Sequence, residues 1–291
     1  MHIKIALEWF LNPDHLPLIL GLTEGWYAAE GLQVRLEEPS DHYDGLAAVA
    51  AGEIAFACNE PLHMIDAERP GLRALGCFFE TEGGVLLHRR SAERLLAGDT
   101  IRLASPVAGG ITDRIAREIL RRWAEGLGAH IRPEGIAIDS AGFQHLANMQ
   151  QGYDGAWLCF ANFEAVEARA AALDHVFVTA AMGDFPNFSA LELFTAERFL
   201  ADHGDLVAKL GALIGRAAEL CRRDPQLAAR AWYAYSGTTP TPLMDAILAD
   251  TCPRLVAPFR RDAERWRDMW SRFNAMGLSA VDAEGYAALY R

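Results

Sequence analysis

Aromatic and hydrogen-bonding side chains are concentrated in one short segment near the N-terminus, Glu8-Trp9-Phe10-Leu11-Asn12-Pro13-Asp14-His15. A loop of this composition at the end of a strand suits a planar heterocycle, which would stack on Trp9 or Phe10. The side chain of Asn12 or Glu8 would then hydrogen-bond the edge of the ring, with His15 completing the pocket. The alternative is that both aromatic rings belong to the core and that His15 caps the following helix. We adopt the ligand pocket as the prediction.

A second group of polar residues follows the predicted strand at residues 54–58. Glu60 and His63 stand three residues apart at the start of a predicted helix, so they can share one face. Together they could bind a ligand amine, although a lone histidine on a partly apolar helix is more often a packed, hydrogen-bonded residue. Tyr43, at the start of the preceding predicted helix, is assigned to the same pocket.

The middle of the chain supplies the other half of the predicted site. Residues 105–112 place small side chains directly before a strong amphipathic helix, where free backbone N–H groups and the helix dipole suit an anionic or carbonyl group. The spacing matches neither a P-loop nor a dinucleotide fingerprint, and an ordinary strand-to-helix turn is the alternative. Trp157 and Asn162 end a later strand and are predicted to meet the ligand from the opposite side. The residues assigned to the turn itself are Gly109, Gly110 and Thr112.

Motifs for covalent catalysis and for structural metal binding are missing from the sequence. There is no Gly-x-Ser-x-Gly elbow and no cysteine in a recognisable Cys/His arrangement. A metal site would need His15, His42 or Asp44 to converge from separate loops, and none is predicted. The cysteines are odd in number and widely spaced, which argues against a disulfide framework or a zinc ribbon. We expect small core residues at Cys58, Cys77, Cys159, Cys221 and Cys252.

The composition indicates a globular protein whose partner is a small molecule. At 291 residues with 51% apolar side chains, the chain can build one large or two medium α/β domains. Its 39 acidic residues outnumber 27 basic ones, and the net charge of -12 repels phosphate backbones and anionic membranes. Nucleic acid is therefore excluded as a predicted partner. Only Lys4 and Lys209 carry a lysine amine, which restricts chemistry that needs one.

The first residues of the sequence indicate where in the cell the protein is expected. A strand-like run follows Met1 directly, without the basic segment, apolar segment and small-residue cleavage site of a secretory leader. No apolar run approaches the ~18 residues of a spanning helix, so no membrane insertion is predicted. We expect a cytoplasmic protein, and a periplasmic location would require that a leader has been removed.

The predicted elements form a two-lobed α/β protein. Short apolar strands alternate with amphipathic helices in the first half of the chain, which is typical of mixed, mostly parallel sheets flanked by helices. We expect residues 1–90 to form the first part of lobe one, residues 91–184 to form lobe two, and residues 185–291 to return to lobe one. The chain after about residue 205 is predicted to be a nearly all-helical C-terminal cap. The chain is thus predicted to cross twice between the lobes, and two such crossings make a hinge. We expect the ligand in the inter-lobe cleft, at the carboxyl ends of the strands.

With these residues identified, the chain resembles the pyrimidine-precursor synthases of thiamine biosynthesis and their relatives, the thiamine-precursor and other solute-binding proteins of the type II periplasmic-binding-protein fold. The resemblance is strongest between residues 7 and 65 and fades in the second lobe. It is specific enough for membership of the superfamily but not for an activity. The residues that carry it are Trp9, Pro13, His15-Leu16-Pro17, Glu24-Gly25-Trp26-Tyr27, Glu30-Gly31-Leu32-Gln33-Val34 and Glu38-Pro39.

The resemblance implies a chemistry that this sequence matches only in part. In the eukaryotic synthases of the family, the protein consumes its own histidine together with a pyridoxal phosphate held by a lysine, and His63 stands at the position of that histidine. Asn59 stands where the lysine would be, and neither lysine of the chain is placed to form a Schiff base. Residues 182–189 replace a cysteine-rich run of the family and contain no cysteine. We therefore expect no cofactor and no synthase chemistry.

The leading hypothesis is a non-catalytic binder of a small aromatic or heterocyclic metabolite, such as a thiamine pyrimidine or a vitamin B6-like compound. Glu8 stands where the synthases usually carry an amide, and its acceptor-only carboxylate favours a ligand with an amine or a protonated ring nitrogen. One alternative is an enzyme on the same scaffold, a divergent pyrimidine-precursor synthase or a chorismate-dehydratase-like lyase, with His63 or Glu60 as the acid/base group. Another is the substrate-binding component of an ABC transporter, partnered by a permease. A homodimer is also compatible with the sequence.

Overall fold

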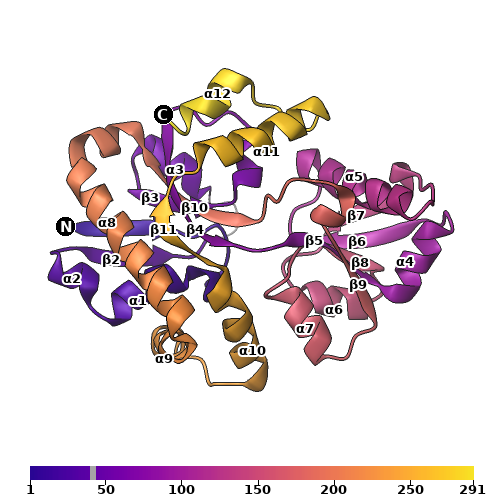
Figure 1. Cartoon of the computed structure of the whole chain (residues 1–291), viewed down its shortest axis with the longest axis horizontal. Coiled ribbons are helices and arrows are strands. Elements are labelled where there is room, and N and C mark those ends of the chain that lie inside the picture. Colours follow the sequence, from indigo (N-terminus) through magenta and orange to yellow (C-terminus); the bar gives the residue numbers. More distant parts are fainter. Residues whose placement is uncertain (40–43) are drawn as a thin grey trace. The chain divides into compact units, whose positions relative to one another are not determined.

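Two compact units make up the chain in the computed structural model, which describes residues 1–39 and 44–291. Unit 1 contains Met1–Glu80, Ala190–Trp270 and Ala280–Arg291, and unit 2 contains Thr81–Ser189 and Ser271–Ser279. The colours of Figure 1 follow the chain from one unit into the other and back. Tyr43, predicted to line the ligand pocket, lies outside the described residues, as does His42.

Unit 1 is built around a six-stranded mixed sheet. Its strands, in spatial order, are β11 (Leu255–Arg260), β4 (Leu72–Glu80), β10 (Ala190–Ala196), β3 (Phe56–Asn59), β1 (His2–Ala6) and β2 (Gln33–Glu37). β1 pairs in parallel with β2 and β3, whereas β10 runs antiparallel to β3 and β4, and β11 runs antiparallel to β4. Along β1, buried Ile3 and Ile5 alternate with exposed His2 and Lys4, the period of two that a strand imposes.

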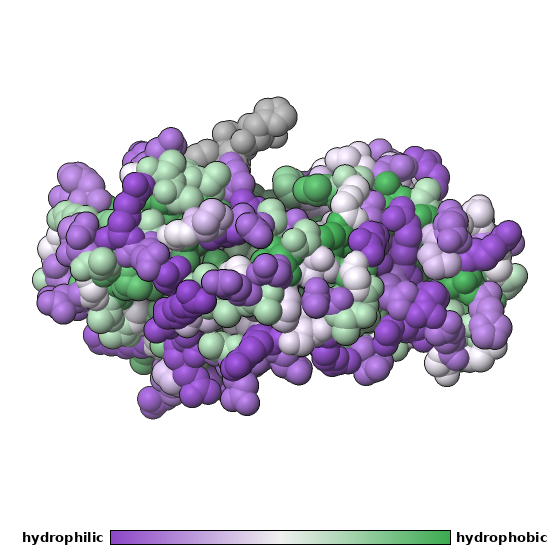
Figure 2. Space-filling model, turned by 90° about the horizontal axis from the view of Figure 1, so that it is seen from above, coloured by the Kyte–Doolittle hydropathy of each residue, from purple (hydrophilic) through white to green (hydrophobic). Residues whose placement is uncertain are grey.

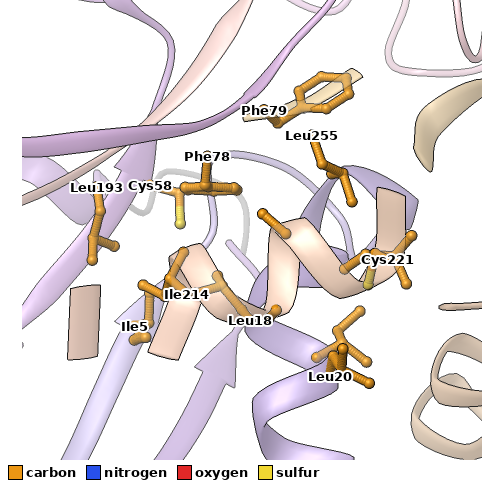
Figure 3. Close-up of a cluster of buried hydrophobic side chains, with 14 of the residues drawn as sticks. Ile5, Leu18, Leu20, Cys58, Phe78, Phe79, Leu193, Ile214, Cys221 and Leu255 are labelled. Atoms are coloured by element: carbon orange, nitrogen blue, oxygen red, sulfur yellow. The ribbon is translucent and has the colours of Figure 1, made fainter. Parts of the chain in front are cut away.

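Helices bury the apolar side chains of the unit 1 sheet. They are α1 (Leu16–Thr23), α2 (Trp26–Ala29), α3 (Gly45–Ala51), α8 (Glu197–Arg223), α9 (Pro225–Ser236), α10 (Pro242–Thr251), α12 (Ala283–Ala288) and the first part of α11 (Ala263–Ala275), whose residues from Ser271 onward belong to unit 2. α1 packs against α8 and α9, and the main core forms between these helices and the sheet. In Figure 3, Leu18 of α1 and Ile214 of α8 lie beside Ile5 of the sheet. Each buried aliphatic side chain of this kind stabilises the fold by roughly 1.5–3 kcal/mol.

Unit 2 has a five-stranded mixed sheet of its own. Its strands, in spatial order, are β7 (Ile136–Ser140), β6 (Ile101–Ser105), β8 (Gly155–Phe160), β5 (Gly83–His88) and β9 (His175–Thr179). β6 pairs in parallel with β7 and β8, and β5 runs antiparallel to β8 and β9. The flanking helices are α4 (Arg89–Leu96), α5 (Gly110–Gly126), α6 (His145–Gln150) and α7 (Glu164–Ala170). α5 buries Ile115, Ile119 and Trp123 along one face, as an amphipathic helix does.

Several details of the fold differ from the expectations drawn from the sequence. β5, expected in lobe one, pairs with β8 and β9, so the first crossing falls after residue 80 rather than after residue 90. β11 interrupts the C-terminal region that is predicted to be nearly all helical. It contains Pro258, which an edge strand tolerates because its missing N–H leaves no central ladder bond unmade. Antiparallel pairs are also more numerous than predicted, because β5 and β10, next to the crossings, run against their neighbours.

Apolar side chains on the surface are scattered among polar ones. On the face drawn in Figure 2, hydrophilic side chains in purple alternate with smaller apolar patches in green. Singly exposed apolar side chains are normal on a folded domain. Among the helices that the structure describes, none is long and apolar enough to cross a membrane. The large apolar side chains that are exposed in the described chain are Met1, Phe10, Val107, Leu127, Phe143 and Met182.

Candidate functional site

Two polar loops of unit 1 meet at one edge of its sheet. β1 and β3 are adjacent and parallel, with Ala6 opposite Ala57. Since the carboxyl ends of parallel neighbours lie at the same edge, the loop of residues 8–15 lies beside the loop of residues 60–64. The register of these two strands therefore brings together the two polar groups that the sequence predicts for this half of the chain.

His15 and Asn12 shape the first loop from inside. The buried His15 places its Nε2 3.1 and 3.2 Å from the two carboxylate oxygens of Glu8. Asn12 caps the short helical turn Pro13–His15, because its Oδ1 accepts a hydrogen bond of 2.9 Å from the backbone N–H of Asp14. The amide of Asn12 is thus engaged in the turn, and Glu8 is the group that these two residues hold in position.

The charges of the first loop stabilise one another. Burial lowers the pKa of His15, but the carboxylates of Glu8 and Asp14 outweigh burial, so this pKa lies above its ordinary value. The imidazole is therefore protonated more readily than in water and pairs with Glu8. Breaking such a buried pair leaves one charge without its partner, which is strongly destabilising.

Glu60 of the second loop changes its charge near neutral pH. Burial raises its pKa to about 7; His63 opposes this shift, and the carboxylates of Glu8 and Asp14 add to it. The Nε2 atom of His63 lies 3.8 Å from Glu60 Oε2, and 30% of the His63 side chain is exposed. Glu60 is therefore a buried carboxyl group next to two other carboxylates and one accessible imidazole.

A chain of charged groups continues from His63 toward α3. His63 Nδ1 lies 3.5 Å from Asp66 Oδ2. Burial lowers the pKa of His63, but Asp66 and Glu60 raise it above its ordinary value. Arg69 Nη1 donates to Asp44 Oδ2 at 3.0 Å, and Asp44 accepts from two backbone N–H groups at the start of α3. The second loop is thereby tied to the helix that precedes β3.

Two aromatic rings complete the edge. Trp9 is half-buried and Phe10 is 36% exposed, with their ring centroids 5.8 Å apart and their planes tilted by 60°. Both rings remain accessible on the loop that carries Glu8. We call the group formed by Glu8, Trp9, Phe10, Asp14, Glu60 and His63 the strand-end site.

The strand-end site has the chemistry of a receptor for an organic cation. Its acidic side chains, Glu8, Asp14 and Glu60, outnumber its one imidazole, His63, and a positively charged ligand group would favour the ionised form of Glu60. An aromatic ring of a ligand could stack on Trp9 or Phe10. Within residues 1–39 and 44–291, no group of three or more His, Cys, Asp or Glu side chains is arranged to hold a metal ion.

The turn before α5 in unit 2 is capped by the protein's own carboxylate. Gly109 and Gly110 have φ of 104° and 71°, which glycine adopts without strain. The N–H of Gly109 donates to Asp113 Oδ2 at 2.8 Å, and Thr112 Oγ1 lies 3.4 Å from Gly109 O. This corrects part of the prediction: the Gly109 N–H is already satisfied, and the Asp113 carboxylate opposes an anion beside it.

Trp157 and Asn162 are interior residues of unit 2. Neither side chain has exposed surface, and the ring of Trp157 packs edge-on against Phe188 with centroids 5.9 Å apart. Trp157 is covered because β8 is a central strand that is buried on both faces. Asn162 follows this strand and is buried as well. The ligand contacts of both side chains stay predictions.

The two lysines are engaged elsewhere in unit 1. Lys4 on β1 pairs with Glu37 of β2 at 2.9 Å, and Lys209 on α8 pairs with Glu30 at 3.0 Å. Asn59, at the position where the related synthases carry their lysine, accepts the backbone N–H of Glu60 with its side chain. The residues of this site thus include no amine that could form a Schiff base. The five cysteines are all buried and free.

Asp14 and Asp66 belong to the charge network but were absent from the predicted set of ligand residues. Asp14 stands inside the predicted loop, where its charge raises the pKa of Glu60. Asp66 follows His63 by three residues, the same spacing that pairs Glu60 with His63 on one helical face. A search for carboxylates at this spacing on both sides of His63 would have found Asp66.

Comparisons of sequence confirm the resemblance. A family model described as NMT1/THI5 like matches residues 12–83 and 107–228. The chain is 26% identical over 80 residues to the 4-amino-5-hydroxymethyl-2-methylpyrimidine phosphate synthase of Uromyces fabae, and 28% identical over 69 residues to that of Legionella pneumophila. These matches cover 27% and 24% of the chain and only 24% and 22% of the two relatives.

Comparisons of structure confirm the predicted fold class. The aliphatic sulphonate binding protein SsuA of Escherichia coli has a TM-score of 0.71 at 14% identity, with 100% of this chain and 92% of that chain covered. The nitrate-binding protein NrtA of Synechocystis PCC 6803 has a TM-score of 0.69 at 12% identity, with 99% and 84% covered. The fold is that of the type II periplasmic binding proteins.

The two kinds of comparison agree with the geometry described above. The first range of the family match, residues 12–83, includes Asp14, Glu60 and His63 of the strand-end site, and the second includes the turn before α5. Because the matched ranges cover more than half of the chain, the protein belongs to the NMT1/THI5-like family.

Proposed function

We propose that the protein is a solute-binding protein that holds a small aromatic or heterocyclic cation at the strand-end site. The observation that carries the proposal is the buried carboxyl group of Glu60, whose pKa is raised to about 7 with Glu8 and Asp14 as its neighbours. A cationic ligand group would relieve the repulsion among these carboxylates. The accessible rings of Trp9 and Phe10 supply apolar contact for the rest of the ligand.

An aminopyrimidine or a pyridine of the vitamin B6 type is the ligand class that we propose. Such rings are flat, and they carry an exocyclic amine or a basic ring nitrogen that a carboxylate can bind. The relatives that match about a quarter of the chain are synthases of a pyrimidine phosphate. The family model matches residues 12–83, which include Glu60 and His63, and this makes pyrimidines the first compounds to test.

We further propose that binding needs no cofactor. A Schiff base with pyridoxal phosphate requires a lysine amine, and both lysines of the chain pair with glutamates away from the strand-end site. A pyridoxal compound would then be a reversible ligand. Its absorbance spectrum would not change to that of an internal imine when the protein is added.

Thermal unfolding with added ligands tests the proposal. Aminopyrimidines, pyridoxine and aromatic acids are added to the wild-type protein, and a true ligand raises the melting temperature further as its concentration increases. Trp9→Ala and Glu60→Gln should abolish the shift. Trp26→Ala, which removes another half-buried tryptophan of unit 1, is the matched control and should keep it. A shift with aromatic acids alone would overturn the cationic ligand, and no shift with any compound would overturn the binding function.

Acid/base catalysis is a second candidate function, favoured by the position of His63 between Glu60 at 3.8 Å and Asp66 at 3.5 Å. An imidazole with a raised pKa and partial exposure can exchange protons with a bound substrate. Complementation of a strain that requires the thiamine pyrimidine separates the candidates. Rescue by the wild-type gene and not by His63→Ala would favour an enzyme, and lack of rescue together with a ligand-induced thermal shift would favour the binder.

A role as the substrate-binding component of an ABC importer rests on the fold. The similar structures include a ligand binding component of an ABC-type import system from Staphylococcus aureus, with a TM-score of 0.70 at 13% identity. Genes for a permease and an ATPase next to the gene of this protein would support the role. The cytoplasmic location, the periplasmic alternative, the homodimer and the inter-lobe ligand cleft stay predictions.

A further inference from the structure

Three arginines of α5 surround a cavity within unit 2. The cavity has a volume of about 480 Å³ and is lined by Arg114, Arg117 and Arg122 together with Glu118 and four less polar residues, Pro133, Ala275, Met276 and Leu278. The arginines are three, five and eight residues apart, so they lie on the side of α5 opposite to its buried face. Arginines in a row on a helix usually point into solvent. Here the segment with Ala275, Met276 and Leu278 forms the other side of a cavity.

Backbone carbonyl groups hold two of the guanidinium groups at the cavity. Arg114 Nη2 donates to Gly277 O at 2.6 Å, in the turn that carries Met276 and Leu278. Arg117 Nε donates to Ile136 O at 3.1 Å. A guanidinium has five N–H donors, so most donors of both groups are left over after these bonds. Fixing the two side chains in advance lowers the conformational entropy that a ligand must overcome on binding.

The positive charge of this cavity is not neutralised by its own acidic residue. Glu118 accepts hydrogen bonds from Arg121 and from Arg122 Nε at 3.0 Å. The bond from Arg121 is the largest cause that lowers the pKa of Glu118, and it prevails over burial. Outside the lining, Arg117 Nη2 lies 3.9 Å from Asp113 Oδ2, and Arg122 Nη1 lies 3.7 Å from Asp184 Oδ2. Within the part of the chain that the structure describes, Arg114 is bound only to a backbone carbonyl and Arg117 has one distant carboxylate, so the two guanidinium groups keep much of their positive charge for a ligand.

We propose that this cavity binds the phosphate group of a small phosphorylated molecule with an apolar body. A phosphate monoester carries roughly 1.5–2 negative charges at neutral pH, which matches the two guanidinium groups. Arginine pairs bind phosphate through parallel N–H···O bonds, and Met276, Leu278 and Pro133 offer apolar contact to the remainder of the ligand. The volume suits a small metabolite. The net charge of -12 opposes a nucleic acid or an anionic membrane as the source of the phosphate.

Calorimetric titration with three probes tests the proposal. Phenyl phosphate should bind the wild-type protein, inorganic phosphate should bind more weakly because it lacks the apolar body, and phenol should not bind. Binding of phenyl phosphate should weaken as salt is added, because the guanidinium groups are partly exposed. Benzoate, a monoanion, should bind more weakly than phenyl phosphate. Equal affinity for benzoate would overturn the phosphate assignment.

Substitutions test whether phenyl phosphate binds in this cavity or elsewhere on the protein. Arg114→Gln with Arg117→Gln should weaken phenyl phosphate binding roughly tenfold or more, since two charge-assisted contacts are lost. Met276→Glu keeps both arginines but introduces a carboxylate among the lining residues, and it should have the same effect. Arg90→Gln, an exposed arginine on α4, is the control for one lost charge and should bind as the wild type does. Unchanged binding in both cavity variants would overturn the proposal.

The cavity and the strand-end site lie in different units, so the two binding proposals can be tested independently. Trp9→Ala and Glu60→Gln should leave the affinity for phenyl phosphate unchanged. The two cavity variants should in turn keep the thermal shift that a cationic heterocycle produces at the strand-end site. Loss of phenyl phosphate binding in Glu60→Gln would assign the phosphate to the strand-end site and overturn the cavity proposal.

Discussion

The strand ends of the two units differ in how their polar groups are used. In unit 1, the loops after β1 and β3 bring Glu8, Asp14 and Glu60 together, with His15 buried beneath them and His63 at the surface. In unit 2, the turn after β6 is closed by Asp113, and Trp157 is enclosed in the core. Carboxylates that repel one another are common at functional sites, whereas groups satisfied within the protein serve stability. The difference supports the proposal that a cationic ligand binds at the strand-end site of unit 1.

The comparison also shows why similar sequence patterns lead to different environments. Both regions place a tryptophan and a polar residue close to the end of an apolar strand. Trp9 stands in a loop beyond β1, whereas Trp157 stands inside β8, between two neighbouring strands. A residue within a central strand is covered on both faces of the sheet, and a residue beyond the strand end is not. Position relative to the strand end therefore separates an accessible tryptophan from a core tryptophan.

Trp157→Ala should have the largest effect on stability. Removing a fully buried tryptophan should lower the free energy of unfolding of unit 2 by about 3–5 kcal/mol, because a cavity replaces its packing against Phe188. Trp9→Ala should cost less than about 1 kcal/mol. Urea unfolding followed by circular dichroism measures both. Equal losses in the two variants would remove the distinction between the strand ends.

His15→Ala should destabilise unit 1 by about 3 kcal/mol, because the carboxylate of Glu8 would lose its buried partner. The same urea experiment measures the loss. Combining His15→Ala with Glu8→Gln removes the unpaired charge and should recover part of the lost stability. If the double variant is no more stable than the single one, the pair does not hold the loop together.

Glu60→Gln should change how stability depends on pH. The pKa of Glu60 in the folded protein, about 7, lies above the ordinary value of 4.5. The protonated Glu60 therefore contributes about 3 kcal/mol to the free energy of unfolding. This contribution is complete below pH 4.5 and is lost as the pH rises through 7. Relative to the wild type, the variant should therefore gain stability between pH 4.5 and pH 8. Melting temperatures across this range measure the gain.

Glu192→Gln is the matched control for Glu60→Gln. Burial raises the pKa of Glu192 to about 7 as well, but its oxygens accept hydrogen bonds of 2.9 Å from Trp266 Nε1 and Tyr290 OH inside unit 1. Both variants should lose part of the pH dependence of stability, and only Glu60→Gln should lose the response to a cationic ligand. Loss of that response in Glu192→Gln would contradict the assignment of the ligand to the strand-end site.

Gly109→Ala should have the smallest effect, a loss of about 1 kcal/mol, because its φ of 104° is strained for alanine while the space around it is open. Gly126→Ala, at the other end of α5, has no such strain and should not lose stability. Ligand binding at the strand-end site should be unchanged in both variants. A larger loss of ligand response in Gly109→Ala would show that the turn of unit 2 takes part in recognition.

Much of the fold follows from the order of apolar runs and turn residues. The strands at residues 101–105 and 155–160 and the amphipathic helix α5 lie where the periodicity predicts them. The helical segment after the first loop is divided between α1 and α2, because Gly25 adopts a left-handed conformation. β11 was missed because an edge strand next to long helices has no alternation of its own, and its partner β4 lies far away in the sequence.

The sequence by itself determined the α/β class, the family, and the two loops of unit 1 that carry polar residues, because these depend on neighbours along the chain. Only the tertiary structure decided which of those residues interact. Glu60 acquires its raised pKa from burial and from Glu8 and Asp14, more than forty residues earlier in the chain. Trp157 is buried by the packing around β8, which lies between β6 and β5. Burial and long-range charge interactions arise only when distant segments pack together.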